Sequence, residues 1–257
     1  MIDLLAFVVP PELAPLGAGF LVVMSFFTSA ITGAIGLGGG LFMLAILATM
    51  LPPPVVIPVH GVVQIGSNLG RAVLMRREID RELFWPFALG TVIGVPLGAM
   101  VVTELPIDVL RLLLAMFVLW AVWAPKIKPT KLAPRWFVAV GGVTSFVTMF
   151  LGATGPFVAV FVNPERLGRL KTVATHAACM TAQHAFKVAA FTAIGFAFLP
   201  WLPLLALMIG AGFVGTLFGR RFLDRLPEAT FARIFKFVLT ALALKLGYDA
   251  VTGFAGG

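Results

Sequence analysis

Four polar side chains recur at helical spacing within an otherwise apolar stretch in the first half of the chain. They are His60, Gln64, Asn68 and Arg71. On an α-helix this spacing keeps all four within one face over a rise of about 16 Å. Polar groups are costly against lipid tails, so such a face must point into protein or a polar cavity. Imidazole, amide and guanidinium groups together are suited to binding an anion.

A second polar stripe lies in the other half of the chain. It consists of His176, Gln183, His184 and Lys187. Lys187 lies near the middle of its apolar segment, where an unpaired cation is expensive. Because the apolar segments contain almost no acidic residues, a bound anion would supply the missing charge. Arg71 lies nearer a segment end, where reaching to the membrane interface is the structural alternative. His60 and His176 are either interfacial histidines or proton carriers.

Glycine-rich interruptions precede a short apolar segment in each half. The first includes Gly36, Gly38, Gly39 and Gly40, and the second is Gly152-Ala153-Thr154-Gly155-Pro156. Glycine inside a helix costs about 1 kcal/mol relative to alanine, so these runs predict broken helices. Unwound backbone at membrane depth is tolerated where it lines a cavity, and a restarting helix directs free N–H groups at an anion. The alternative is close helix packing, as expected for Gly94, Gly98, Gly215 and Gly219.

The two stripes belong to a longer internal repeat. A displacement of 116 positions relates His60 to His176, Thr32 to Thr148 and Trp85 to Trp201. A five-residue insertion in the second copy then aligns Gly94 and Gly98 with Gly215 and Gly219. We therefore predict one transmembrane domain over residues 1–257. Repeat one covers about 14–124 and repeat two about 135–251, with a basic loop at 125–134 between them.

The composition places the chain in a membrane. Hydrophobic residues make up 60% of it, charged residues 12%, and the mean hydropathy is +1.04. Long unalternating apolar runs predict an all-α membrane protein. The expected helical segments in repeat one are about 14–32, 39–51, 55–75, 83–103 and 107–124. Those in repeat two are 135–151, a short piece after Pro156, and about 170–197, 200–221 and 228–251.

Basic residues cluster in four of the expected loops, which the positive-inside rule assigns to the cytoplasm. The clusters lie around 76–81, 126–135, 166–171 and 220–225. They share one side of the membrane only if both termini lie on the other. The basic loop after segment 55–75 corresponds to an uncharged turn near Pro200, so we expect two repeats of inverted topology. The predicted location is the bacterial inner membrane with periplasmic termini. Charge leaves open whether the short segments cross or re-enter.

Other classes of function have weaker support in the residues. A zinc or copper site could use His176, Cys179 and His184, although the neighbouring charge of Lys187 opposes a cation. There is no His-Glu-x-x-His, no Gly-x-Ser-x-Gly and no Walker A sequence. We therefore expect no enzyme activity, no resident metal or cofactor, and no nucleic-acid partner.

The motifs resemble those of the TauE/SafE family of sulfite and organosulfonate permeases. The resemblance is carried by Gly36-Leu-Gly-Gly-Gly40, the run from Pro52 to Arg71, Gly152-Ala-Thr-Gly155-Pro156, Lys171 to His176, and Gln183-His184-Ala-Phe-Lys187. It implies duplicated transmembrane helices and transport of small sulfur-containing anions, such as sulfite, sulfoacetate or other organosulfonates.

Together these features predict a secondary transporter, acting as an exporter by alternating access. We expect the two polar stripes to bind the anion with Gly38, Gly39, Gly40, Thr154 and Gly155. Protons are a candidate coupling partner through the histidines. A passive anion channel and a metal-binding membrane protein are the alternatives, and a homodimer is left open.

Overall fold

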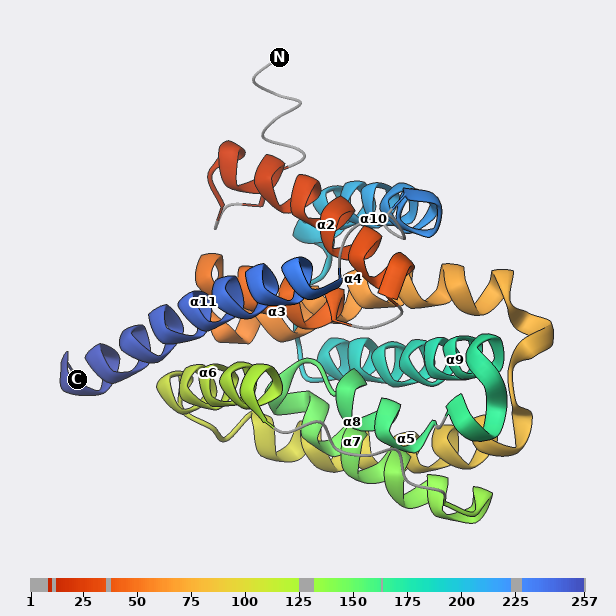
Figure 1. Cartoon of the computed structure of the whole chain (residues 1–257). Coiled ribbons are helices and arrows are strands. Elements are labelled where there is room, and N and C mark those ends of the chain that lie inside the picture. The colour runs from red at the N-terminus through yellow and green to blue at the C-terminus, as the bar shows by residue number, and fades with distance from the viewer. Residues whose placement is uncertain are drawn as a thin grey trace.

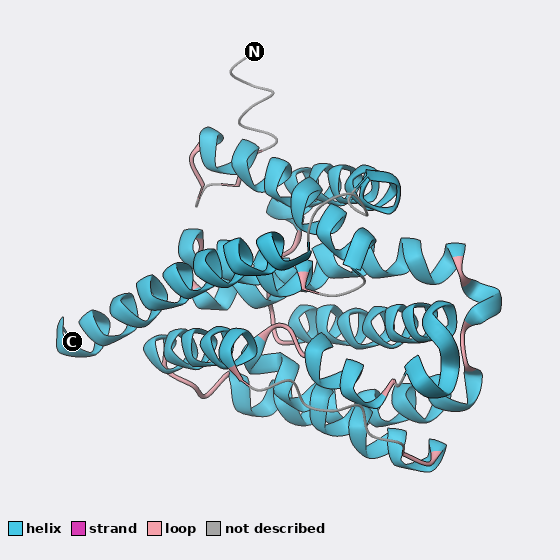
Figure 2. Ribbon diagram, viewed as in Figure 1, coloured by secondary structure: helices cyan, strands magenta, loops and turns pink. Residues whose placement is uncertain are grey.

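The computed structural model describes residues 9–10, 13–35, 38–124, 132–162, 164–222 and 228–256. Within these residues every regular element is helical and none is a β-strand (Figure 2). The predicted all-α fold is confirmed in this part of the chain. Predictions that involve Gly36, the central loop at 125–131, Arg225 and the two chain ends fall outside the described residues.

The helices follow the order of segments expected from the sequence. The first half contains α2 (Pro15–Ile35), α3 (Gly39–Met50), α4 (Pro53–Leu74), α5 (Arg81–Val102) and α6 (Ile107–Trp123). The second contains α7 (Phe137–Leu151), α8 (Gly155–Phe161), α9 (Pro164–Ala193), α10 (Leu202–Phe222) and α11 (Glu228–Gly256). Short 3₁₀ helices lie at Arg76–Glu78, Pro134–Trp136 and Leu199–Trp201.

One element differs clearly from its predicted bounds. Helix α9 spans Pro164–Ala193, but Gly168 inside it is non-helical, with φ 72° and ψ 163°, so two helices meet there. The long helix after Gly168 begins about where the sequence predicts, and it ends at Ala193 instead of about 197. Glycine is the residue that adopts such a φ without strain. The residues before Gly168, predicted as part of a basic loop, form a short helical turn instead.

The short segments after the two glycine breaks are real helices. Helix α3 has 12 residues and α8 has 7, which correspond to lengths of about 18 and 10 Å. Neither length covers a hydrocarbon core of about 30 Å. The chain turns into these helices at Gly38 (φ 99°) and Gly152 (φ 74°). These backbone conformations are rarely open to other residues.

The helices are stacked in layers (Figure 1). Helices α2 and α10 pack together on one outer side, and α5 and α7 on the other. Glycines allow this close approach, because an added Cβ at any of them would crowd a backbone carbonyl of the facing helix. The four are Gly94, Gly98, Gly215 and Gly219. The expectation of close packing at these glycines is confirmed.

Helices α4 and α9 run side by side between the two outer pairs (Figure 1). The His60 ring lies 5.8 Å from the His184 ring, centroid to centroid. Ala72, which follows His60 along α4, packs with Ala177, which precedes His184 along α9. The two helices are therefore antiparallel.

The outer helices are the apolar ones. Four described helical stretches are long and apolar enough to cross a membrane: Pro15–Ala34, Arg81–Val102, Pro134–Leu151 and Leu199–Gly219. These correspond to α2, α5, α7 and α10. They screen the polar stripes of α4 and α9 from the lipid, as expected for a multi-pass membrane protein.

Candidate functional site

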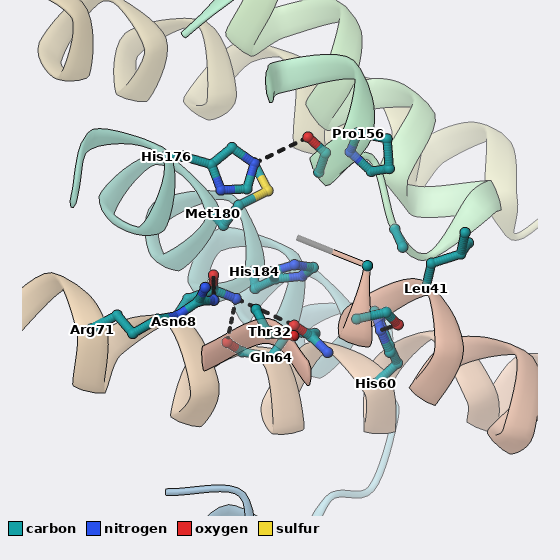
Figure 3. Close-up of a pocket in the computed structure, with 14 residues that line it drawn as sticks. Thr32, Leu41, His60, Gln64, Asn68, Arg71, Pro156, His176, Met180 and His184 are labelled. Carbon is teal, nitrogen blue, oxygen red and sulfur yellow. Dashed lines mark hydrogen bonds between the residues drawn. The ribbon is translucent and has the colours of Figure 1, made fainter. Parts of the chain in front are cut away.

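A cavity of about 50 Å³ lies where α4 and α9 face the starts of the two short helices (Figure 3). It is lined by Thr32, Gly38, Gly40, Leu41, His60, Gln64, Asn68, Arg71, Ala153, Gly155, Pro156, His176, Met180 and His184. Both polar stripes and both glycine breaks therefore contribute to one site.

The α4 wall of the cavity is a hydrogen-bonded polar chain. Arg71 Nη2 donates to Asn68 Oδ1 over 2.7 Å, and Arg71 Nε donates to the Ser67 carbonyl over 3.2 Å. Asn68 Nδ2 donates to the Gln64 carbonyl at 2.8 Å and to Gln64 Oε1 at 3.3 Å. The side chain of Arg71 is 6% exposed, so it lies inside the protein instead of reaching to the membrane interface. Its guanidinium is fixed by neighbours on its own helix.

The two equivalent histidines hold the starts of the two short helices. His60 Nε2 lies 2.9 Å from the Gly40 carbonyl oxygen, and His176 Nε2 lies 3.0 Å from that of Gly155. A carbonyl oxygen only accepts, so Nε2 carries the hydrogen in both rings. His184 completes the set, and all three histidines of the chain line this one cavity. Both His60 and His176 are buried inside the protein.

Lys187 does not line the cavity. It is fully buried, and its Nζ donates to the Gly152 carbonyl over 2.8 Å. An added Cβ at Gly61 would lie 3.0 Å from Lys187 Cε, so the lysine stem packs against α4 just beyond His60. The ion pairs found in the described residues are Arg111–Asp108 and Lys245–Asp249. The Nζ of Lys187 therefore faces a backbone carbonyl of the second glycine break.

Gln183 also supports this break. Its Oε1 accepts from the Thr154 hydroxyl at 2.9 Å, and its Nε2 donates to Thr144 Oγ1 at 3.3 Å and Ser145 Oγ at 3.1 Å. Neither Gln183 nor Thr154 lines the cavity. Gly39 is likewise outside the lining, because it packs directly on the Thr28 carbonyl of α2. Gln183, Thr154 and Gly39 therefore support the residues that line the cavity without lining it themselves.

Five lining residues were missed in the sequence: Thr32, Leu41, Ala153, Pro156 and Met180. Met180 had a usable signal. It lies 116 positions after Gln64, which is the displacement of the repeat. Helices α4 and α9 therefore each contribute lining residues at positions i, i+4 and i+8. On α9 the residue at i+4 is Met180, and Gln183 of the predicted stripe is not in the lining.

The described residues contain no group of three or more His, Cys, Asp or Glu side chains that could hold a metal ion. Cys179, whose thiol a zinc or copper site with His176 and His184 would need, packs in an apolar cluster with Leu83, Phe87 and Val158. Cys179 is absent from the cavity lining that contains His176 and His184. The geometry therefore gives no support to the metal-binding interpretation.

The fold and the cavity define a multi-pass helical membrane protein in which residues of both polar stripes line a common cavity. A family model described as "Sulfite exporter TauE/SafE" matches residues 21–246, which is most of the chain. The chain belongs to this family, as the sequence motifs indicated. It is therefore a membrane transporter of the class that carries sulfite or related anions. Comparisons with curated proteins and with solved structures gave no match.

Proposed function

We propose that the protein is a secondary transporter that exports small sulfur oxyanions, and that the cavity between α4 and α9 is its substrate site. The observation that carries this proposal is the presence of Arg71 and Gln64, both hydrogen-bonded to Asn68, in the lining of one cavity. Hydrogen bonds from a charged or amide donor to an oxyanion are strong in such water-poor surroundings. Lys187, just outside the lining, adds a second positive charge nearby.

The size of the cavity favours a compact anion. A water molecule needs about 10–15 Å³ of such space, so there is room for about three to five water-sized groups. Sulfite, with one sulfur and three oxygens, falls in this range. Sulfoacetate and longer organosulfonates would require the cavity to widen.

The contacts support two inverted repeats. Helices α2 and α7 begin the two proposed repeats, and α5 and α10 are the fourth helix of each. The first helix of each repeat packs on the fourth helix of the other. The contacts of Gly94 with Gly142 and of Gly215 with Phe26 are equivalent under the repeat alignment. Helices α4 and α9, the equivalent third helices, cross antiparallel, as an axis in the membrane plane would require.

This arrangement supports an alternating-access cycle. In it, the two short helices and their glycine breaks would open the cavity to one side and then the other. Basic residues at the cytoplasmic loops support insertion in a bacterial inner membrane with periplasmic termini. Proton coupling through the three histidines is part of the same proposal.

Counterflow in proteoliposomes separates a carrier from a passive channel. Vesicles loaded with excess unlabelled sulfite should transiently accumulate radiolabelled sulfite from outside, because a carrier exchanges its substrates one for one. A channel would only equilibrate the label. Absence of any sulfite-dependent uptake or exchange would refute the proposed function.

A further inference from the structure

The two walls of the cavity differ in chemistry. The α4 wall carries the carboxamides of Gln64 and Asn68 and the guanidinium of Arg71. On the opposite side, Figure 3 shows Pro156 at the start of α8 and Met180 on α9. The structure therefore offers hydrogen-bond donors to one side of a small anion and apolar or soft atoms to the other.

Apart from His184, the opposite wall has little capacity to donate a hydrogen bond. Proline has no N–H, and a thioether sulfur donates nothing. The Nε2–H of His176 is occupied by the Gly155 carbonyl, and His184 packs edge-on against the His60 ring. Met180 itself is 2% exposed and lies close to Gly155, where an added Cβ would be 3.6 Å from its sulfur. An oxygen directed at Met180 and Pro156 would lose its hydration without replacement.

The repeat alignment shows which residue differs between the two walls of the cavity. Met180 stands at the position equivalent to Gln64. A glutamine there would give the cavity similar polar groups on both sides. This chain instead has a side chain of similar length that cannot bind an oxyanion oxygen.

We propose that Met180, with Pro156 beside it, is a specificity-determining residue that selects anions with three oxygens and one soft or apolar corner. In sulfite that corner is the sulfur lone pair, in methanesulfonate a methyl group, and in thiosulfate the terminal sulfur. Sulfate has a fourth oxygen there and is rejected. This inference rests on the proposed function, because it takes the cavity as the substrate site.

Thiosulfate and sulfate form the sharpest pair of probes, since both are tetrahedral dianions and differ at one corner. Their affinities, with that of sulfite, can be measured by competition on the purified full-length protein. The parent should bind thiosulfate at least about tenfold more tightly than sulfate. Met180→Gln should reduce this preference to within about threefold by strengthening sulfate binding. Met180→Leu, an apolar change of similar volume, should keep the parent preference.

Two results would overturn the inference: equal affinities of the parent for thiosulfate and sulfate, or an unchanged preference in folded Met180→Gln. If Met180→Gln does not fold, Met180→Thr and the parent's own sulfite-to-sulfate ratio provide the same test. Failure of the parent to bind any of the three anions would instead refute the proposed function. Binding of sulfite without preference over sulfate would leave that function intact and refute only the role of Met180.

Discussion

The two buried cations of the stripes have different places in the structure. Arg71 lines the cavity, whereas Lys187 is bonded to the Gly152 carbonyl outside the lining. Hydrogen bonds to charged groups contribute about 1.5–3 kcal/mol. Arg71→Met should therefore weaken sulfite binding by at least about tenfold. Lys187→Met should cause a smaller loss, since it removes a nearby charge but no direct contact.

Which of the two variants loses more sulfite affinity shows where the anion binds. Titration of sulfite into each purified variant would measure it, with thermal unfolding as the check that both proteins are folded. A larger loss for Lys187→Met than for Arg71→Met would move the substrate away from the cavity and toward the second glycine break.

Gly40, in the cavity lining, and Gly210, on α10 outside it, provide a test and a control for the role of Gln64. An added Cβ at Gly40 would lie 3.0–3.2 Å from the Gln64 carboxamide, which is tighter than ordinary contact. At Gly210 an added Cβ would meet no atom within 4 Å. Gly40→Ala should displace Gln64 and weaken sulfite binding by about fivefold, the value of one hydrogen bond.

Gly210→Ala, outside the cavity lining, is the control and should keep the parent affinity within about twofold. Calorimetric titration of both alanine variants would compare them directly. Equal affinities in the two variants would mean that Gln64 does not contact the substrate.

At the scale of elements, the short helices α3 and α8 are each tied to a long polar helix by one histidine. Replacing His176 by leucine removes the donor to Gly155, whereas glutamine can still donate. His176→Leu should lower the rate of sulfite exchange by about fivefold, corresponding to one hydrogen bond of about 1 kcal/mol. His176→Gln should retain most of it. Equal rates in the two variants would show that the bond to α8 has no part in transport.

Apolar length and glycine breaks were sufficient to predict the helices within a few residues, because both reflect local properties of the backbone. The stripe on α4 was also predicted correctly as cavity-lining. On α9, helical spacing gave the right face but could not say where along its length α9 crosses α4. This crossing sets Lys187 against Gly61, beyond the cavity. It also leaves Met180 in the lining, a residue whose type gave no polar signal.

At the scale of the whole molecule, the proposed orientation puts the ends of α4 and α9 on opposite sides of the membrane. Arg77 follows α4, and Leu199 follows α9; both are exposed. In intact cells expressing a Cys179→Ala background, cysteine at position 199 should react with an impermeant thiol reagent. Cysteine at position 77 should react only after the membrane is permeabilised. The opposite labelling pattern would reverse the orientation, and labelling of both from outside would contradict the inverted repeats.

Locating a bound anion by diffraction tests most directly whether the cavity between α4 and α9 binds a small pyramidal oxyanion. Selenite has the shape of sulfite, and its selenium scatters anomalously, so diffraction from crystals of the protein soaked in selenite would locate the anion. We predict an anomalous peak in this cavity, placed so that the selenite oxygens lie within hydrogen-bond distance of Gln64 and Arg71 and the selenium lone pair faces Met180. A peak beside the exposed Arg76 and Arg77, or no ordered peak from protein that exchanges sulfite, would contradict it.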